Sequence, residues 1–356
     1  MFSFLSKKTE YTMQVSPFDR RVTVRSDQSL LEAGLENGLN MPHSCRVGSC
    51  TTCKCRLVEG KVKELTDFSY VLDLDELQQG YILACQTLPR SDVTIEYPTI
   101  GGQPETELKH SVPIADYAGT VTSSRKLTHD IVEVVITLKE PLVYTAGQYA
   151  DIGPAGGDVT RSYSFASLGE PAGSTELVFH IRYIPGGELS GWFYEQDRTG
   201  EQMNVRGPFG SFRLTQPERP IFCIAGGSGM APIKAILEDA RSRGAASEVR
   251  YLFGARTRRD IYCVQEMREM EAAWQAPFSF VPVLSEEPET DDWPGPRGLV
   301  TESIAEYADL PGMAGACYYL CGPPRMIDAA LAVLAGIGVP AERIFYDKFL
   351  DSSHKA

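Results

Sequence analysis

Four cysteines near the start of the chain constrain its fold more than any other feature. Three of them lie in the stretch CRVGSCTTC, as Cys45, Cys50 and Cys53, and the fourth is Cys85 in ILACQT. The spacing C-x4-C-x2-C with a more distant fourth cysteine is that of plant-type [2Fe–2S] centres. A loop that wraps a compact cluster must present three thiolates from one side, and the small Gly48 lets its backbone approach the cluster sulfurs. The spacing therefore predicts an iron–sulfur cluster bound by these four cysteines.

Two other cysteine chemistries fit the spacing less well. A structural zinc site usually contains two short C-x2-C pairs, whereas the second half of this motif is a single cysteine. The chain has nine cysteines, an odd and unevenly clustered number, which favours a metal site over a disulfide framework. Cys55 is expected to pack inside the strand that continues from the loop. Arg46 either offsets the charge of the cluster or is a solvated loop residue.

Length and composition indicate a globular protein with more than one domain. At 356 residues the chain is too long for one ordinary core, and 23% charged residues is typical of soluble proteins. No run approaches the roughly 18 apolar residues of a membrane span, and the start lacks the cleavage site of a signal peptide, so we expect a cytoplasmic protein. The net charge of −13 argues against nucleic-acid binding, because phosphates would repel it.

The residue composition and the hydrophobic pattern change along the chain, and these changes predict three domains with one linker. Residues 1–98 combine short alternating strands with an amphipathic helix and predict a small mixed sheet. Residues 99–112 carry proline, glycine and charge without an apolar period and form the expected linker. Residues 113–217 contain strands between glycine and proline turns, which favours an antiparallel β-barrel. In residues 218–356 strands alternate with helices, which predicts a doubly wound parallel sheet. The fold class is thus multidomain, with α+β, β and α/β parts.

The segment around the cysteines resembles a known kind of domain. PHSCRVGSCTTCKCRLVEGKV, with YILACQT further on, is similar to the plant-type ferredoxin domain of reductase components from bacterial multicomponent oxygenases, such as phenol hydroxylase, methane monooxygenase and benzoate dioxygenase. The resemblance covers nearly the whole chain. It implies a β-grasp ferredoxin, a flavin-binding barrel and a nicotinamide domain of the ferredoxin–NADP reductase type.

Two stretches of the barrel segment match the needs of a flavin, which requires an aromatic face, donors to its ring, and cations or N–H groups at its phosphates. In RSYS, Tyr163 can stack on the ring, Arg161 can pair with the pyrophosphate and Ser164 can reach the N5 edge, with Ser162 between them. In IPGGELS, Gly187 opens an expected short helix whose N-terminus would hold phosphate. Each stretch alone could be a core tyrosine or an ordinary turn, but together they indicate a flavin.

The resemblance adds further flavin residues. In the family the short helix supports the flavin diphosphate, and the matching positions are Gly187, Leu189 and Ser190. The strand HIRY, which contains Ile181 and Arg182, resembles the strand beside the flavin ring. FAD is expected rather than FMN, because the FMN-binding relatives place their ferredoxin domain at the C-terminus.

A glycine turn opens the last segment. FCIAGGSGMAPIKAIL runs from an apolar strand into a helix and departs from the fingerprint G-x-G-x-x-G. The version G-G-S-G-x-x-P is the one seen in ferredoxin reductase-type domains. Its residues Gly227, Ser228 and Gly229 would let the backbone approach a pyrophosphate, and Pro232 is expected in the first turn of the helix, where a missing N–H costs little.

One later stretch is expected near the nicotinamide, and another near the flavin. CGPPRM, with Cys321, Gly322 and Pro323, follows another predicted parallel strand, and ligands of such sheets bind at the carboxyl ends of strands. The resemblance implies that a C-terminal strand brings an acidic or aromatic residue near the flavin, which makes Asp347 and Phe349 candidates. With Ser164, the residues Cys321 and Asp347 are therefore the candidate catalytic residues.

The choice between NADH and NADPH depends on FGARTRRD. Arg256, Arg258 and Arg259 could bind a 2′-phosphate, whereas Asp260 would disfavour one. The resemblance implies NADH, because oxygenase reductases commonly carry a similar turn, and NADPH is the alternative.

These motifs together imply a path for electrons. A nicotinamide delivers two electrons as hydride, a [2Fe–2S] centre accepts one at a time, and a flavin can do both. We therefore expect transfer from NADH to FAD, then to the cluster, then to a separate protein. The resemblance implies that this acceptor is a monooxygenase, dioxygenase, P450 or desaturase component.

Two other functions remain open from the sequence alone. A reductase subunit of a quinone oxidoreductase shares this domain order, but such subunits carry an N-terminal membrane helix, for which MFSFLSKK is too short. A redox-sensing electron carrier would be expected to have damaged flavin or nicotinamide motifs, and both motifs are intact.

Overall fold

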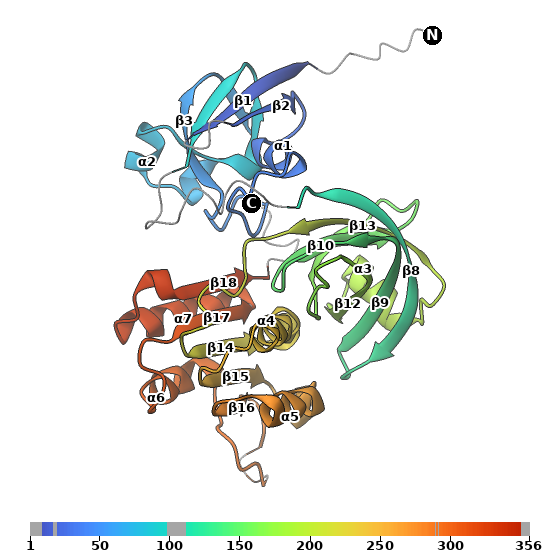
Figure 1. The fold of residues 1–356 in the computed structure, drawn as a ribbon, viewed down its shortest axis with the longest axis vertical. Coiled ribbons are helices and arrows are strands. Elements are labelled where there is room, and N and C mark those ends of the chain that lie inside the picture. Colours follow the sequence, from blue (N-terminus) through green and yellow to red (C-terminus); the bar gives the residue numbers. More distant parts are fainter. Residues whose placement is uncertain (1–8, 17–19, 98–111, 289, 291, 350–356) are drawn as a thin grey trace. The chain divides into compact units, whose positions relative to one another are not determined.

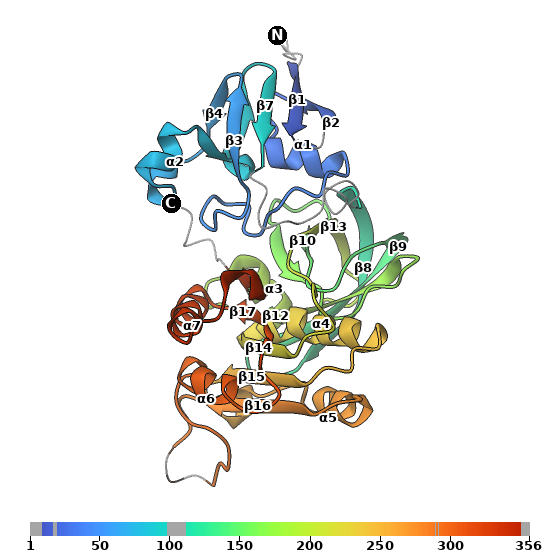
Figure 2. The same ribbon diagram turned by 60° about the vertical axis from the view of Figure 1, so that its left-hand side comes forward.

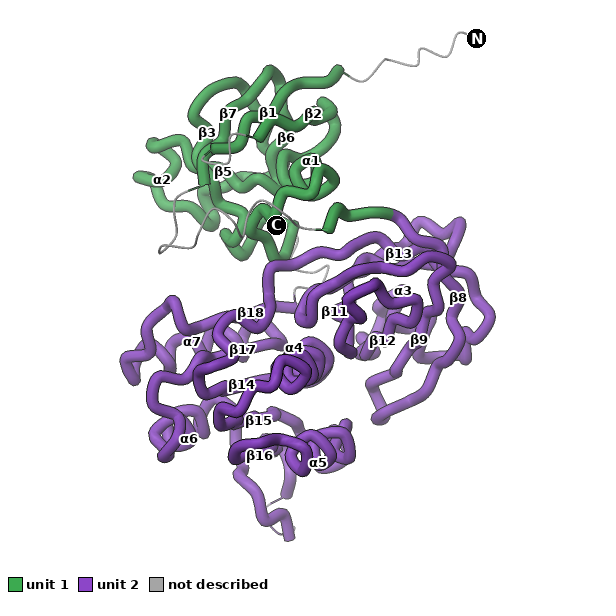
Figure 3. The backbone as a smooth tube through the Cα atoms, viewed as in Figure 1, with its two compact units in different colours: residues 1–115, 351–356 green, residues 116–350 purple. Residues whose placement is uncertain are grey.

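The computed structural model describes residues 9–16, 20–97, 112–288, 290 and 292–349 (Figure 1). They form two compact units, one within residues 1–115 and the other within residues 116–350 (Figure 3). The predicted linker lies almost entirely outside the described residues, and the predicted domain boundaries stay a prediction. Among the described helices, none has both the length and the apolar character that crossing a membrane requires.

The first unit is a mixed sheet with a helix packed against it. Its sheet has the order β2-β1-β7-β3-β5, in which β1 and β7 run parallel and the other neighbours antiparallel. A separate antiparallel pair joins β4 to β6. The elements are β1 (Glu10–Ser16), β2 (Arg20–Arg25), α1 (Leu30–Glu36), β3 (Lys54–Glu59), β4 (Val62–Glu64), α2 (Leu74–Gln78), β5 (Tyr81–Leu83), β6 (Thr87–Pro89) and β7 (Val93–Glu96).

Helix α1 forms where the sequence places a cap before an apolar run. The Ser29 hydroxyl accepts a hydrogen bond from the N–H of Glu32 at 3.1 Å, which satisfies a donor that the helix leaves unpaired. Its own residues Leu30, Leu31 and Leu35 are buried. The predicted mixed sheet with a helix is thus confirmed.

The second unit begins with an antiparallel sheet that curls into a barrel. Its order is β11-β10-β13-β8-β9-β12, and a bridge between Phe165 and Phe179 links the two edge strands. Both phenylalanines are fully buried in the barrel core. The elements are β8 (Ala115–Lys126), β9 (Ile131–Leu142), β10 (Tyr149–Pro154), β11 (Arg161–Ser164), β12 (Ser174–Arg182), α3 (Glu188–Glu195) and β13 (Gln202–Phe209).

A five-stranded parallel sheet completes the second unit. Its order is β16-β15-β14-β17-β18, with all neighbours parallel. Successive strands are added on one side of β14 as far as β16 and on its other side from β17 onward, so the strand order reverses between β14 and β17. Helices α4 and α5 cover one face, and α6 and α7 cover the other (Figures 1 and 2). The elements are β14 (Ile221–Gly226), α4 (Met230–Ser242), β15 (Val249–Ala255), α5 (Val264–Ala273), β16 (Phe278–Leu284), α6 (Ile304–Ala308), β17 (Cys317–Gly322), α7 (Pro324–Gly336) and β18 (Ile344–Lys348).

Alternate residues of β14 face opposite cores, as a strand buried on both sides requires. Cys223 belongs to the core under α4 and α5, whereas Phe222 belongs to the core under α6 and α7. Cys223 and Cys317 are both 0% exposed. Both cysteines are therefore packing residues of the sheet. The predicted doubly wound sheet is confirmed, and ligands of such sheets bind where the strand order reverses.

Candidate functional site: a cysteine loop and a nucleotide pocket

The four predicted cluster ligands come together as two pairs. The N–H of Cys45 lies 3.5 Å from the sulfur of Cys50, and a hydrogen bond between the two side chains lowers the pKa of Cys45 to about 5. A hydrogen bond with Cys85 likewise lowers the pKa of Cys53. All four are free thiols. Each pair therefore contains one sulfur whose pKa is lowered, which favours the thiolate, the form that binds metal.

The paired arrangement fits two irons rather than one zinc ion. In a tetrahedral zinc site with bonds of about 2.3 Å, the four sulfurs lie about 3.8 Å apart. Among the described residues, the group of three or more potential ligand atoms that all lie within 4.8 Å of one another is His129, Asp130 and Asp260, without a cysteine. Two pairs of thiols instead offer two ligands to each iron of a [2Fe–2S] cluster.

The loop between the thiols adopts a conformation that non-glycine residues rarely take. Arg46 and Thr51 have φ values of 56° and 58°, and Gly48 has a φ of 87°. Strained backbone of this kind concentrates at functional sites, where the surrounding structure enforces it. The Gln86 amide contributes by donating a hydrogen bond to the carbonyl of Arg46 at 2.8 Å. Our sequence analysis missed Gln86, because its partner is a backbone carbonyl 40 positions away.

The predicted flavin residues of RSYS form the edge strand β11. Arg161 and Ser162 are exposed, with Ser162 donating a hydrogen bond to Asp151 at 2.6 Å. Tyr163 is half-buried against the barrel core, and burial raises the pKa of its hydroxyl. Ser164 is buried. The strand therefore offers a cation at one end and an anchored aromatic ring beside a hydroxyl at the other.

The N-terminus of α3 has the close packing expected of a phosphate cradle. Gly187 is its N-cap and is not assisted by a side-chain cap within the described residues. A Cβ at Gly187 would lie 2.5 Å from the Ser190 hydroxyl and 2.9 Å from the backbone carbonyl oxygen of Ile184, so the position favours glycine. That hydroxyl accepts a hydrogen bond from the N–H of Ile184 at 3.2 Å, while Leu189 packs in the barrel core. The first N–H groups of the helix thus keep their capacity to bind an anion.

The glycine turn lies between β14 and α4, as expected. Gly227–Gly229 form a single 3-10 turn that includes Ser228, and Pro232 is buried in the first turn of α4. A Cβ at Gly229 would come under 3.0 Å from the carbonyl oxygen of Cys321, so the turn presses against the end of β17. The two predicted nucleotide motifs are therefore in direct contact.

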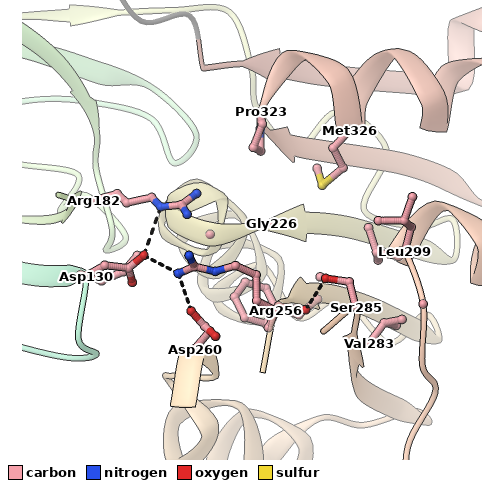
Figure 4. Close-up of a pocket in the computed structure, with 17 residues that line it drawn as sticks. Asp130, Arg182, Gly226, Arg256, Asp260, Val283, Ser285, Leu299, Pro323 and Met326 are labelled. Carbon is pink, nitrogen blue, oxygen red and sulfur yellow. Dashed lines mark hydrogen bonds and ion pairs between the residues drawn. The ribbon is translucent and has the colours of Figure 1, made fainter. Parts of the chain in front are cut away.

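A pocket opens beside this turn, at the carboxyl ends of β14, β15 and β16 (Figure 4). Four predicted site residues line it, namely Arg182, Gly227, Arg256 and Pro323. Its wall also contains residues from all parts of the second unit: Asp130, Ile131, Gly226, Phe253, Gly254, Ala255, Asp260, Val283, Ser285, Gly298, Leu299, Val300 and Met326. The mixture of backbone turns, apolar groups and charges suits a dinucleotide.

The candidate catalytic residues at the C-terminal end lie side by side but are buried. Cys321 in β17 pairs in register with Asp347 in β18, and the N–H of Phe349 donates to the carbonyl of Gly322 at 3.0 Å. Cys321 is 0% exposed, and burial raises the pKa of its thiol. Neither Cys321 nor Gly322 is among the residues that line the pocket. Their roles, like that of Asp347, stay predictions.

Our sequence analysis missed Asp130, which lies in the turn between β8 and β9. Its carboxylate contacts the guanidinium of Arg182 at 3.4 Å and that of Arg256 at 2.8 Å. Arg256 also pairs with Asp260 at 2.6 Å. Asp130 and Arg256 are 126 positions apart in the sequence, and nothing in the local stretch LTHDI points to a distant partner.

Comparison with known proteins identifies each domain. The family described as a 2Fe-2S iron-sulfur cluster binding domain matches residues 13–90. An oxidoreductase FAD-binding domain matches residues 118–214, and an oxidoreductase NAD-binding domain matches residues 223–331. The predicted cofactors are confirmed: the chain binds a [2Fe–2S] cluster, FAD and a nicotinamide dinucleotide.

Relatives along the whole chain have a shared role. The xylene/toluene monooxygenase electron transfer component XylA of Pseudomonas putida is 41% identical over 340 residues, which cover 96% of this chain and 94% of XylA. The phenol 2-monooxygenase reductase component DmpP of a Pseudomonas species is 33% identical over 350 residues, which cover 97% of this chain and 96% of DmpP. Among solved structures, the cytochrome P450 reductase GcoB of Amycolatopsis has a TM-score of 0.84 at 32% identity, with 95% of this chain and 98% of GcoB covered. The chain belongs to the family of [2Fe–2S], FAD and NAD-binding reductase components that supply electrons to separate oxygenase components.

Proposed function

We propose that this reductase is cytoplasmic, uses NADH, and passes electrons to the terminal component of a monooxygenase that acts on an alkyl-substituted aromatic hydrocarbon. The observation that carries the choice of acceptor is the 41% identity to the xylene/toluene monooxygenase component. The propane, phenol and naphthalene oxygenase reductases are 31–34% identical over comparable lengths. A reductase that is more similar to one system throughout its length is expected to share the acceptor of that system.

The predicted site residues form three binding sites, one for each cofactor. Cys45, Cys50, Cys53 and Cys85 would hold the cluster, and the RSYS strand with the start of α3 would hold FAD. The glycine turn and the pocket would hold NADH. When bound, NADH supplies hydride, FAD accepts electrons in pairs and releases them singly, and the cluster carries one electron at a time.

Within the second unit, the chain's own groups bind and orient these partners. Tyr163 offers a flat apolar face, and Arg161 offers a positive charge at the other end of the same strand. Arg182 extends from the barrel to the glycine turn. A Cβ at Gly227 would lie only 3.2 Å from its guanidinium. Since Arg182 also lines the pocket, the barrel itself contributes a side chain to the proposed nucleotide site.

An anaerobic titration of the holoprotein tests the choice of donor. We expect NADH at stoichiometric amounts to bleach the flavin absorbance and to produce the EPR signal of a reduced [2Fe–2S] cluster, whereas NADPH does so far more slowly. Equal reduction by the two nucleotides would contradict the proposed NADH dependence. Flavin bleaching without a cluster signal would contradict the proposed order of electron transfer.

A reconstituted assay tests the acceptor. The reductase is mixed with NADH, toluene and the terminal component of the P. putida xylene/toluene monooxygenase, and hydroxylated product is measured. The matched reaction contains phenol and the terminal components of phenol 2-monooxygenase. We expect turnover in the first mixture that exceeds turnover in the second. Turnover with the phenol system alone would overturn the proposed acceptor.

Replacing Tyr163 with alanine is expected to lower the affinity for FAD by about tenfold or more. A stacked aromatic pair contributes roughly 1 kcal/mol in addition to the apolar area that it buries, and a total of about 1.4 kcal/mol already corresponds to tenfold. The measurement is the ratio of flavin to protein absorbance after gel filtration. Tyr163→Phe keeps the ring and should keep FAD. Tyr70→Ala removes a tyrosine that is 79% exposed in the other unit, and should also leave FAD content unchanged. Unchanged FAD in Tyr163→Ala would refute the stacking role.

A further inference from the structure

The geometry of the pocket points to Asp130, a residue of the flavin barrel, as a determinant of nucleotide selectivity. We propose that Asp130 binds the two guanidiniums of the pocket and thereby denies them to a 2′-phosphate, so that the site accepts NADH and discriminates against NADPH. This inference rests on the proposed use of NADH and names the residue that enforces it from the other domain.

Charges of opposite sign alternate across the pocket. Arg182, Asp130, Arg256 and Asp260 form a continuous chain of ion pairs, with side-chain separations of 3.4, 2.8 and 2.6 Å (Figure 4). All four line the pocket. Two members come from the barrel and two from the loop after β15, so the chain also links the two halves of the second unit.

Asp130 is held in the orientation that this chain requires. One carboxylate oxygen accepts a hydrogen bond from the Thr128 hydroxyl at 2.9 Å, and the other oxygen contacts both guanidiniums. Its backbone carbonyl accepts the N–H of Tyr183 at 2.8 Å, which ties the turn to the end of β12. The side chain is 15% exposed. Asp130 is therefore a fixed, largely desolvated charge, and such charges act strongly on neighbouring groups.

The cluster of His129, Asp130 and Asp260 is not available to a metal ion. The Arg256 guanidinium contacts a ligand-type atom of each of the three residues, at 3.4 Å from the His129 ring, 2.8 Å from Asp130 and 2.6 Å from Asp260. A cation already occupies the centre of this group. The carboxylates therefore act on Arg256 and not on a metal.

Neutralised arginines make a poor site for a 2′-phosphate. A phosphate monoester carries about −1.5 to −2 charges and needs cations with unused bonding capacity. Within the pocket, Arg182 and Arg256 face Asp130 and Asp260, so their charges cancel. Arg258 is also engaged, with Glu287 at 3.2 Å and Asp292 at 2.6 Å. Arg259 is exposed and is not among the residues that line the pocket.

NADH has hydroxyl groups where NADPH has this phosphate, and it leaves the charge chain intact. A ribose can donate hydrogen bonds to carboxylates, which is how acidic residues recognise it in related sheets. NADPH must instead place its phosphate against two carboxylates or separate them from the arginines. Removing the charge of Asp130 frees the Arg182 guanidinium and leaves Arg256 with Asp260 as its one carboxylate partner in the chain of ion pairs.

The test is the Asp130→Asn variant, which keeps the shape of the side chain and can still accept the Thr128 hydrogen bond. Binding of 2′,5′-ADP and of 5′-AMP to the FAD-loaded protein is measured by calorimetry. We expect the ratio of the two dissociation constants to shift by about tenfold toward 2′,5′-ADP, as the gain of one charge-assisted hydrogen bond would produce. The ratio of kcat/KM for NADPH and NADH should shift in the same direction.

Two variants serve as controls. Asp116→Asn removes another carboxylate of the barrel that pairs with an arginine, Arg206 at 2.7 Å, and Asp116 is not among the pocket residues. Its binding ratio should equal that of the unaltered protein. Asp130→Glu keeps the negative charge that Asp130→Asn removes, and should keep much of the discrimination against 2′,5′-ADP. Asp130→Ser removes the charge with a smaller side chain and should shift the ratio as Asp130→Asn does.

The outcomes separate this inference from the proposed function. A protein that prefers NADPH before any substitution would refute the proposed NADH dependence. If the unaltered protein prefers NADH but Asp130→Asn changes the binding of both fragments by the same factor, or of neither, this inference alone is overturned. Loss of FAD from both Asp130→Asn and Asp130→Ser would also overturn it, because Asp130 would then support the fold and not selectivity.

Discussion

Replacing Cys85 with serine is expected to remove the [2Fe–2S] cluster and to leave NADH-driven reduction of ferricyanide nearly unchanged. Cys85 forms one of the two thiol pairs with Cys53, so its loss leaves one iron with a single thiolate. The flavin and nucleotide motifs lie in the other compact unit, which does not depend on the cluster for its core. Iron content and visible absorbance report the cluster, and ferricyanide reduction reports the flavin.

The second acceptor in this experiment is cytochrome c, which receives electrons through the cluster in the proposed order of transfer. We expect Cys85→Ser to lose most of its cytochrome c reduction, by about a hundredfold, as loss of a ligand typically costs at least as much as the 10–100-fold of an outer-shell partner. A variant that keeps its full iron content would show that Cys85 is not a ligand.

Cys55→Ser is the matched control. Cys55 is 0% exposed in β3 and lies two residues after Cys53, so it tests whether proximity to the loop is enough to affect the cluster. We expect its iron content and cluster spectrum to match those of the unaltered protein, with a loss of stability of roughly 1–3 kcal/mol from the buried hydroxyl. A bleached spectrum would show that Cys55 takes part in binding iron.

The features that could be predicted from the sequence are those in which neighbouring residues act together. The cysteine spacing, the RSYS strand and the glycine turn each carry their chemistry within one short stretch, because a loop that wraps a ligand must be continuous. The alternation of strands and helices after residue 218 likewise follows from the burial of each strand on both faces. These predictions were confirmed for the fold and the cofactors.

The features that were missed depend on contacts between distant segments. Asp130 looks like an ordinary turn residue, and its partners Arg182 and Arg256 lie 52 and 126 positions further along the chain. Gln86 holds the cysteine loop through the carbonyl of Arg46, a group that every residue has and that no motif can reveal. The fold determines both contacts, and a single sequence contains no local signal for them.

Gly229 also packs against a segment that is distant in the sequence, the end of β17. The packing is so close that a side chain at this position is expected to have a large effect. A Cβ there would lie under 3.0 Å from the Cys321 oxygen, 2.7 Å from the Cys321 carbonyl carbon and 3.2 Å from the Gly322 nitrogen. All three atoms belong to the backbone of β17, which pairs with β14 on one side and β18 on the other. No side chain can rotate to make room, so the glycine turn itself must move.

We therefore expect Gly229→Ala to reduce the rate of flavin reduction by NADH about a hundredfold, because a shift of about 1 Å in a positioning group can cost that much. Overpacking should also lower the free energy of unfolding by roughly 1–3 kcal/mol. FAD content should be kept, because the flavin residues lie on the barrel. Stopped-flow absorbance measures the rate, and Gly336→Ala, at the end of α7 with nothing within 4 Å of its added Cβ, should react as the unaltered protein does. If Gly229→Ala reduces its flavin at the normal rate, the turn does not position the nucleotide, and the contact between β14, β17 and the glycine turn serves the fold alone.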